Sequence, residues 1–340
     1  MDMPTMESVD KFKAAMDSDR GALGPFMICT DPALVESAGR AGYDFVLLDM
    51  EHGTTTFQTL PNLIRAANVT GVCPVVRVPR GSDIWIDQAL DVGAGAVMIP
   101  QIDTAEQARA AVSAAKFSPV GTRGTCRFVR SAGFGDVPGS EYFSRAQDTV
   151  VILQAEGQKA IDNLDEILDV PGIDVVFVGP YDLSSSLGHV GEIDHPEVIA
   201  AIKQIIAKAA AKLIYAFHDM TAPKVNVIVG AANGTASLAM NNSADMTYAW
   251  PQATIGMMDP VSAAKIMYAD EIAKADDKNA LISEKAAAYA KLQASAESAA
   301  KRGYVDSIIA PETTRQIAAA AFEMLFTKRE DRPAKKHGTV

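Results

Sequence analysis

The sequence predicts an α/β fold with parallel strands, closed as a barrel rather than left as an open doubly wound sheet. Strand-like segments are short, continuous apolar runs, as expected for strands covered on both faces. Segments of helical length separate these runs at a spacing typical of repeated β/α units. Polar residues follow several successive strands rather than one switch point, and this pattern favours the barrel.

Local signals support the elements in chain order. Six strands are expected at Leu23–Thr30, Tyr43–Met50, Val72–Pro79, Ala94–Ile102, Val150–Ala155 and Val175–Val178. The helices between and after them are expected at Pro32–Gly42, Phe57–Asn68, Asp83–Val92, Ala105–Phe117, Gln158–Leu168 and Pro196–Lys212. Asp31 can cap the first helix, and Thr104 with Gln107 matches a capping box. Gly42 and Gly93 stand where helices end.

The pattern of apolar runs and the composition of the sequence change after residue 212. Two further apolar runs, Leu213–Phe217 and Val225–Val229, are predicted to close the barrel as strands seven and eight. An Ala/Lys/Glu-rich stretch over Val261–Arg302 is predicted to be helical. The expected divisions are therefore a barrel over 1–230, a mostly helical segment over 231–327 and a basic tail over 328–340.

Composition excludes several classes of protein. The 340 residues are 48% apolar and 21% charged, which is enough to build a core. A net charge of −11 argues against a nucleic-acid or anionic-membrane partner. The cysteines, Cys29, Cys73 and Cys126, are too few and too far apart for a disulfide framework or zinc cluster. No signal peptide or membrane span is visible, so a cytoplasmic protein is expected.

Charged side chains follow four of the six predicted strands. His52 follows the second strand, Arg77 lies near the end of the third, and Glu156 and Asp182 follow the fifth and sixth. A parallel barrel places its active site at these ends. Two carboxylates without a Cys or His cluster favour Mg²⁺, Mn²⁺ or a similar ion with open coordination positions. The pattern therefore indicates metal-assisted chemistry.

Two carboxylate ligands leave room for a bidentate 2-oxo acid, whose enolate the metal would stabilise. Arg77 suits the developing charge on the keto oxygen, and His52 is the natural proton carrier. Taken alone, His52 is equally a surface loop histidine; an acidic neighbour, Asp91 or Asp49, would orient its ring. A Schiff-base mechanism is not expected, because the lysines before residue 200 all lie outside the predicted strands: Lys11, Lys13, Lys116 and Lys159.

Ordered motifs over residues 10–212 resemble the HpcH/HpaI aldolase family, metal-dependent 2-oxo-acid aldolases allied to the citrate lyase β subunit. The motifs are FVLLDMEHG, PVVRVP, GAGAVMIPQIDTAEQARAAV, FSPVGTRG, LQAEG and DVVFVGPYDLSSSLG. The resemblance implies a (β/α)8 TIM barrel of the phosphoenolpyruvate/pyruvate type, assembled as a hexamer, and a Mg²⁺, Mn²⁺ or Co²⁺ ion. LQAEG stands where the family more often has a Gln-Ile-Glu run, but the ligand positions are retained.

The same resemblance implies roles for individual residues. Glu156 and Asp182 would bind the metal, with Gln154 close by. His52 and Asp91 would form a proton-transfer dyad, and Arg77 would bind the pyruvyl oxygen. The backbone of Gly179 and Pro180 would line the carboxylate pocket.

The C-terminal part resembles a different family, the β subunits of biotin-dependent acyl-CoA carboxyltransferases, which have a crotonase-like fold. The matching segments are LIYAFHDMTAPKVNVIV, ADMTYAWPQATIGMMDP, RGYVDSIIAPETTR and EMLFTKREDRPAKKHG. The glycine pair of that family's oxyanion hole would fall at Gly234-Thr235, so one glycine is missing. The chain therefore reads as a fusion whose first part holds a complete catalytic set.

Three functions remain open from the sequence. The leading one is a lyase that cleaves a 4-hydroxy-2-oxo acid to pyruvate and an aldehyde; oxaloacetate decarboxylation passes through the same enolate. The second is a carboxyltransferase component that uses biotin and acyl-CoA. The third is a non-catalytic assembly part that binds a carboxylase partner.

Overall fold

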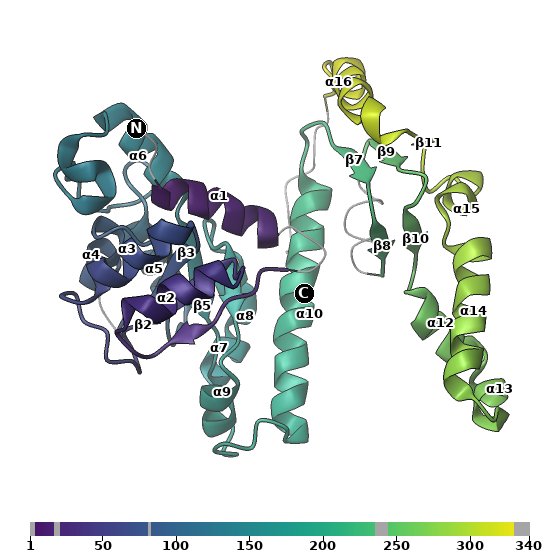
Figure 1. Ribbon diagram of the computed structural model, residues 1–340, viewed down its shortest axis with the longest axis horizontal. Coiled ribbons are helices and arrows are strands. Elements are labelled where there is room, and N and C mark those ends of the chain that lie inside the picture. Colours follow the sequence, from purple (N-terminus) through teal and green to yellow (C-terminus); the bar gives the residue numbers. More distant parts are fainter. Residues whose placement is uncertain (1–3, 17–20, 81–82, 235–243, 330–340) are drawn as a thin grey trace. The chain divides into compact units, whose positions relative to one another are not determined.

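The computed structural model describes residues 4–16, 21–80, 83–234 and 244–329 (Figure 1). The chain divides into two compact units, Met1–Ala209 and Ala210–Val340, here called unit 1 and unit 2. The division lies inside helix α10 (Pro196–Asp219), which continues from one unit into the other. It therefore differs from the boundary near residue 230 that the sequence suggested.

Unit 1 is built on a six-stranded parallel sheet in chain order. The strands are β1 (Phe26–Met27), β2 (Phe45–Asp49), β3 (Cys73–Arg77), β4 (Ala96–Ile99), β5 (Val150–Gln154) and β6 (Val175–Phe177). Every neighbouring pair is parallel, and the register pairs Asp49 with Arg77 and Gln154 with Phe177. All six strands were predicted from the apolar runs, although the first is much shorter than expected.

Helices follow the strands as the β/α pattern requires. They are α2 (Pro32–Arg40), α3 (Leu60–Thr70), α4 (Asp83–Asp91), α5 (Ala105–Ala115), α7 (Gln158–Asp162), α8 (Leu164–Leu168) and α9 (Pro180–Ser186). Asp31 accepts from the backbone N–H of Ala33 at 2.9 Å, and Thr104 with Gln107 forms the predicted capping box. The expected helix over 158–168 is interrupted at Asn163, where α7 ends and α8 begins.

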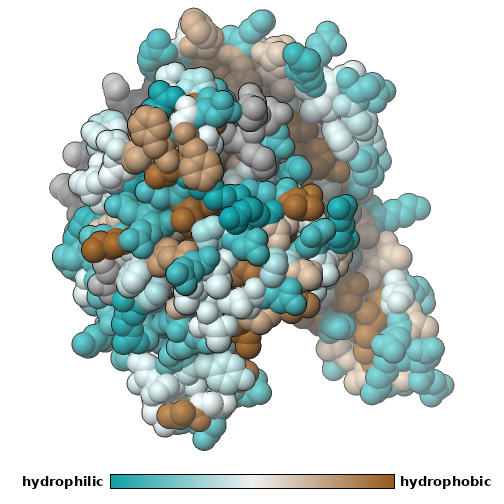
Figure 2. All heavy atoms as spheres, turned by 60° about the vertical axis from the view of Figure 1, so that its left-hand side comes forward, coloured by the Kyte–Doolittle hydropathy of each residue, from teal (hydrophilic) through white to brown (hydrophobic). Residues whose placement is uncertain are grey.

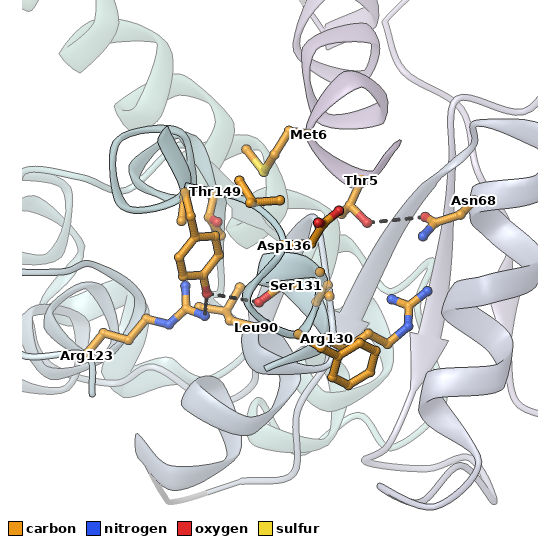
Figure 3. A pocket seen from close by; sticks show the side chains of 16 residues that line it. Thr5, Met6, Asn68, Leu90, Arg123, Arg130, Ser131, Asp136 and Thr149 are labelled. Carbon is orange, nitrogen blue, oxygen red and sulfur yellow. Dashed lines mark hydrogen bonds between the residues drawn. The ribbon is translucent and has the colours of Figure 1, made fainter. Parts of the chain in front are cut away.

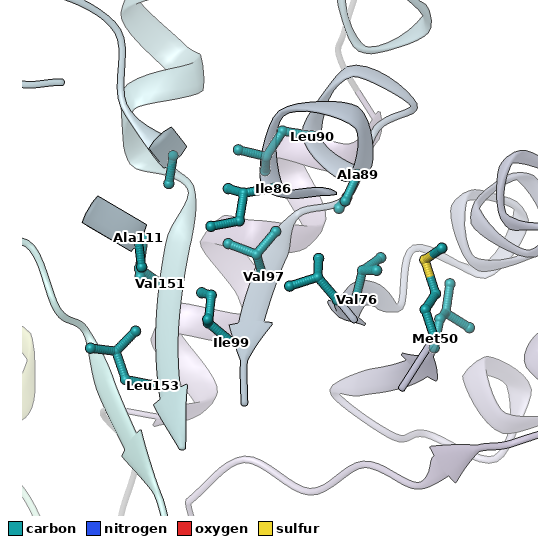
Figure 4. Close-up of a cluster of buried hydrophobic side chains, with 14 of the residues drawn as sticks. Met50, Val76, Ile86, Ala89, Leu90, Val97, Ile99, Ala111, Val151 and Leu153 are labelled. Carbon is teal, nitrogen blue, oxygen red and sulfur yellow. The ribbon is translucent and has the colours of Figure 1, made fainter. Parts of the chain in front are cut away.

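The larger core of unit 1 lies between the sheet and these helices (Figure 4). Alternate residues of β2 to β5 belong to it, including Val76, Val97 and Val151, all fully buried. Ile86 and Leu90 of α4 cover them from the helix side. Burying such side chains supplies about 1.5–3 kcal/mol each, so this layer holds the helices against the sheet.

The opposite face of the sheet is covered by α1 (Pro4–Met16), a helix that the sequence analysis did not identify. Met6, Val9 and Phe12 pack against the other strand residues, among them Val75. The Phe12 and Phe45 ring centres are 5.2 Å apart. The i, i+3, i+6 spacing of these three apolar residues was the signal for an amphipathic helix.

Between α5 and β5 the chain makes a long excursion. It contains η1 (Arg130–Gly135), α6 (Gly139–Arg145) and η2 (Ala146–Asp148). An aromatic cluster holds it together, with the Phe117 and Phe143 rings edge to face at 5.0 Å. Lys116 anchors its base by donating to the carbonyls of Gln147 and Thr149 at 2.7 and 2.6 Å.

Unit 2 contains two small parallel sheets. One has the order β11 (Ser307–Ile308), β9 (Met246–Ala249), β7 (Val225–Ile228), and the other pairs β10 (Thr254–Gly256) with β8 (Ala231–Asn233). The predicted helical stretch after 260 forms α12 (Pro260–Met267), α13 (Ala269–Lys274), α14 (Lys278–Gln293) and α15 (Ala296–Lys301). Helix α16 (Thr314–Met324) follows η3 (Pro311–Thr313).

The prediction that Leu213–Phe217 and Val225–Val229 close the barrel was wrong. The first segment lies inside α10, and the second forms β7, which pairs with β9. Residues 196–219 carry neither glycine nor an internal proline, and alanine and lysine favour continued helix, so a short apolar run there extends α10. Of the predicted Gly234-Thr235 pair, Gly234 has a positive φ of 58° and Thr235 lies outside the described residues.

The face in Figure 2 mixes hydrophilic and hydrophobic side chains, with the hydrophobic ones scattered. Within the described ranges, no helix has the length and apolar character needed to cross a membrane. The expected basic tail begins with a fixed residue, because Lys328 pairs with Asp245 at 2.8 Å. The remainder of that segment, from residue 330, lies outside the described residues.

Candidate active site at the carboxyl end of the parallel sheet

Polar side chains of unit 1 converge where the parallel strands end. Asp49 ends β2, Arg77 ends β3 and Gln154 ends β5. Glu156 comes two residues after Gln154, and Asp182 lies in the first turn of α9, directly after β6. Because parallel strands share one carboxyl edge, these residues from four strand ends form a single cluster.

Arg77 is held by two carboxylates. Its Nε and Nη2 atoms donate to Oδ1 and Oδ2 of Asp49 at 2.9 and 2.6 Å, a bidentate fork, and Nη1 lies 3.2 Å from Oε2 of Glu51. Burial alone would raise the pKa of Asp49, but the hydrogen bonds from Arg77 and from the backbone of Glu51 lower it. Both partners are therefore charged, and two N–H groups of the guanidinium remain beyond these two hydrogen bonds and one ion-pair contact.

His52 lies in a turn that Asp49 organises. Oδ1 of Asp49 accepts from the backbone N–H groups of Glu51 and His52 at 3.0 and 3.3 Å. The His52 ring is 62% exposed, and its Nε2 lies 3.8 Å from Oε2 of Glu51. Burial raises the pKa of Glu51, opposed by Arg77 and His52. The imidazole thus has an acidic neighbour and an open approach from solvent.

Glu156 is a buried carboxylate, with 4% of the residue exposed. Its Oε1 accepts from the backbone N–H of Gln101 at 3.0 Å, and its Oε2 accepts from Nε2 of Gln154 at 2.8 Å. Burial and the nearby charge of Asp182 raise the pKa of Glu156 to about 7. A cation bound beside Glu156 would offset both the burial and the neighbouring negative charge that oppose its ionisation.

Space for Glu156 is provided by Gly179, the residue before α9. A Cβ atom at position 179 would collide with Oε2 of Glu156. The carboxylate therefore lies directly against the backbone that begins α9. This close approach explains why residue 179 is a glycine. Its backbone conformation does not require glycine, because its φ is −89°.

A polar cavity of about 430 Å³ opens beside the two carboxylates. It is lined by Gln101, Asp103, Glu156, Gly157, Gln158, Lys159, Asp182, Ser185 and Ser186. Its oxygen-rich lining suits a hard divalent cation and a small polar ligand. A buried oxygen of Gln154, Oε1, has no hydrogen-bond partner among the described residues, which is a further sign that the site receives a ligand.

Asp91, predicted as the dyad partner of His52, lies elsewhere in unit 1. It ends α4, and a helix that returns between parallel strands ends near their amino ends, opposite His52. Its Oδ1 accepts from Nη2 of Arg123 at 2.9 Å. The His52–Asp91 dyad is therefore not formed within one chain, because the return helix carries Asp91 away from the strand ends.

A second cavity of unit 1, of about 380 Å³, lies on this side (Figure 3). It is bounded by α1, the ends of α3 and α4, and the excursion before β5. Arg123 and Ser131 both contact the hydroxyl of Tyr142, at 3.3 and 2.9 Å. This cavity contains none of the predicted catalytic residues.

Sequence reasoning missed two features of the strand-end site. Gln101, at a positive φ of 53°, turns its backbone N–H toward Glu156. It follows β4, and because its side chain is uncharged it is not among the charged strand ends that indicate the site in the sequence. Lys159 also lines the cavity, three residues after Glu156 on α7. Asp49 was noticed, but as a partner of His52 rather than of Arg77.

Comparisons with known proteins find two family matches along the chain. Residues 23–247 match the family described as HpcH/HpaI aldolase/citrate lyase, and residues 199–340 match the carboxyl transferase domain. The 2-dehydro-3,6-dideoxy-6-sulfogluconate aldolase of Pseudomonas putida is 42% identical over 190 residues, 56% of this chain and 74% of that protein. The 2-keto-3-deoxy-L-rhamnonate aldolase of Escherichia coli strain K12 is 41% identical over 202 residues, 59% of this chain and 75% of that protein.

A solved structure shows the same fold. The crystal structure of an HpcH/HpaI aldolase/citrate lyase family protein from Burkholderia cenocepacia J2315 superposes with a TM-score of 0.55 and 26% identity, covering 77% of this chain and 98% of that one. The predicted class, an α/β TIM-barrel-like unit followed by a carboxyltransferase-like segment, is confirmed. Its relatives are aldolases, enzymes that break carbon–carbon bonds. The chain belongs to the HpcH/HpaI aldolase/citrate lyase family.

Proposed function

We propose that the strand-end site cleaves a 4-hydroxy-2-oxo acid to pyruvate and an aldehyde by a retro-aldol reaction that depends on a divalent metal. The observation that carries this proposal is the buried Glu156 carboxylate, whose pKa is raised to about 7 beside Asp182. Arg77 lies close enough for its charge to act on Glu156. Two carboxyl groups and one arginine would repel an anionic substrate. A bound metal ion would add the positive charge that such a substrate needs.

The donor set fits a hard cation. Glu156 and Asp182 would hold Mg²⁺, Mn²⁺ or Co²⁺, with Gln154 orienting Glu156 through its side-chain amide. When bound, the ion would supply Lewis-acid stabilisation of negative charge on the substrate's keto oxygen. Both side chains line the same cavity, which gives an ion access to them.

His52 would move the proton in the reaction. It would take the proton of the C4 hydroxyl as the C3–C4 bond breaks and the aldehyde leaves, and it would return that proton to C3 of the pyruvate enolate. Glu51, 3.8 Å from Nε2, would orient the ring in place of the predicted Asp91. Arg77 would face the developing charge on the C2 oxygen with the N–H groups that Asp49 and Glu51 leave.

The substrate carboxylate would lie against the start of α9. Gly179 contributes a backbone N–H and the absence of a side chain, whereas Pro180 contributes no N–H donor. Lys159 on the cavity wall would attract the anionic substrate. No lysine is assigned a covalent role; Lys116 is committed to two backbone carbonyls of the excursion.

Hydrogen–deuterium exchange at C3 of pyruvate tests this proposal without knowledge of the aldehyde. The full chain should exchange these protons with Mn²⁺ present, and EDTA should stop the exchange. Release of pyruvate from a 4-hydroxy-2-oxo acid should show the same dependence. Equal exchange with Mn²⁺ and with EDTA would contradict the metal assignment, and absence of exchange under both conditions would contradict the enolate.

We also propose that catalysis resides in unit 1 and that the chain is a homo-oligomer. Unit 1 holds all the residues assigned above, and among the described residues its edge strands β1 and β6 each pair on one side only. Strands that pair on one side only favour association. Sedimentation velocity over a range of concentrations tests the assembly, and a monomer at micromolar concentration would refute it.

A further inference from the structure

A compact cluster of imidazole and carboxylate groups lies in unit 1 away from the strand-end site. The loop between α9 and α10 carries His189, Glu192 and His195. One ligand atom from each of the three lies within 4.8 Å of the other two. None of these residues lines the polar cavity beside Glu156.

Backbone hydrogen bonds fix the loop that presents this cluster. The His189 N–H donates to the carbonyl of the buried Ser184 at 2.8 Å, and the Gly191 N–H donates to the Ser184 hydroxyl at 3.0 Å. Gly188 and Gly191 take the positive φ values, 84° and 81°, that the reversals require. The three side chains are therefore brought together before any ligand binds.

Further backbone bonds join the cluster's own residues. The Glu192 N–H donates to the His189 carbonyl at 2.9 Å, and the His195 N–H donates to the Glu192 carbonyl at 3.0 Å. Two successive turns thus carry the three side chains at intervals of three residues. Their spacing is a property of the backbone rather than of chance side-chain contact.

The two rings of the cluster are close neighbours. The centroids of His189 and His195 are 3.5 Å apart and their planes differ by 20°. Nε2 of His189 lies 3.0 Å from Oε2 of Glu197, which places a second carboxylate beside the pair.

We propose that His189, Glu192 and His195 form a second metal site, for a borderline transition-metal ion such as Zn²⁺, Ni²⁺ or Cu²⁺. Imidazole donors with one carboxylate select these ions over Mg²⁺. At the usual bond lengths, the donor atoms around a tetrahedral ion lie about 3.3 Å apart. The three side chains, whose ligand atoms now lie within 4.8 Å of one another, would therefore rotate closer together to bind the ion. Glu197 orients His189 from outside, as carboxylates do beside metal-bound histidines.

The ion would fix the connection from α9 to α10. Asp182 lies on α9, and the first residue of α10, Pro196, follows His195 directly. A ligand that binds only the folded loop raises the stability of the folded state. We therefore expect Zn²⁺ to raise the melting temperature of the protein through this cluster, whatever reaction the strand-end site performs.

The test uses the full chain carrying E156Q/D182N, which removes both proposed metal ligands of the strand-end site. Metal bound by this background protein then reports the site at His189, Glu192 and His195. Isothermal titration with Zn²⁺ should show one tight site, and adding H189A/H195A should weaken it by at least about 100-fold. H52A in the same background removes another exposed imidazole and should leave the affinity unchanged. Cu²⁺ bound to the background protein should show nitrogen splitting from two imidazoles in its electron paramagnetic resonance spectrum.

E192Q provides a milder variant, because the Glu192 side chain is exposed and the loop's hydrogen bonds use its backbone. It should weaken Zn²⁺ binding by about tenfold. Circular dichroism confirms that each variant is folded. Equal Zn²⁺ affinity with and without the two histidines would overturn the proposal, as would a copper spectrum without nitrogen splitting. Neither result bears on the lyase proposal, since the background lacks its metal site.

Discussion

Both carboxylate oxygens of Asp49 accept hydrogen bonds from Arg77, at 2.9 and 2.6 Å. The two residues are paired with each other in the neighbouring strands β2 and β3. The pair is buried, with no exposure of the Asp49 side chain and 10% exposure of the Arg77 side chain. A fork of this kind fixes the plane of the guanidinium and therefore the direction of its remaining N–H groups. The position of Arg77 in the site is thus set by Asp49.

Asp49→Asn should leave Arg77 without its bidentate partner. We expect a loss of about 3 kcal/mol in unfolding free energy, because breaking one side of a buried pair strands the other charge. Turnover should fall together with pyruvate affinity, since Arg77 is no longer held in place. Urea unfolding and steady-state kinetics measure the two effects. Asp148→Asn, at a surface pair with Arg145, is the matched control and should change stability little.

Glu156→Ala and Asp182→Ala should each abolish Mn²⁺-stimulated turnover. Both residues lie at strand ends and line a cavity, so the helices and core should remain intact. Pyruvate release at saturating Mn²⁺, with circular dichroism as the folding check, measures this. Glu166→Gln, an exposed carboxylate on α8, serves as the control. Metal-stimulated activity in Glu156→Ala would remove the ligand assignment.

His52→Ala should lower the rate by about 10² to 10⁴ with a modest change in pyruvate affinity, because a proton carrier acts mainly in the transition state. Glu51→Gln should retain more activity than His52→Ala, since Glu51 orients the ring and contacts Arg77 but does not itself carry the proton. Rate constants and inhibition by pyruvate analogues separate the two. Near-normal turnover in His52→Ala would transfer the role of base to Glu51 or a water molecule.

Gly179→Ala should damage the site without unfolding the chain. The added methyl group meets the Glu156 carboxylate, whereas φ at Gly179 suits alanine. We expect weaker activation by Mn²⁺ and little change in melting temperature. Gly157→Ala is the control, because its new Cβ would make only ordinary contacts, the nearest 3.4 Å from an Asp103 oxygen. Similar Mn²⁺ activation constants for Gly179→Ala and Gly157→Ala would contradict the prediction that contact with Glu156 damages the site.

Without metal, Glu156 should make stability depend on pH. Its pKa in the folded protein, about 7, lies above the ordinary 4.5, so this group's stabilising contribution is lost as pH rises from about 4.5 through 7. Glu156→Gln should therefore be more stable than the wild type in EDTA at pH 8, by about 1–3 kcal/mol. The difference should narrow as pH falls toward 4.5. A difference independent of pH, measured by urea unfolding, would contradict the raised pKa.

The sequence by itself determined the strands of unit 1 and the residues at their ends. Continuous apolar runs identify strands buried on both faces, and the residue after such a run must lie at the sheet edge. Glu156 and Asp182 were therefore placed together before their contacts were known. Local capping signals, as at Thr104, also held because they depend on neighbours within one turn.

The tertiary structure decided what periodicity leaves ambiguous. The short apolar run Leu213–Phe217 is compatible with either a strand or a helix. In the structure it is helical, because α10 continues through it without a break. Asp91 was expected beside His52, but the return direction of α4 carries it to the other end of the sheet, where it meets Arg123.

Partners far apart in sequence were likewise decided only by folding. Nothing in the order of residues shows that Asp49 serves Arg77 rather than His52, because the choice depends on the register of β2 with β3. The raised pKa of Glu156 has the same origin, since burial and the approach of Asp182 exist only once β5 and β6 lie side by side.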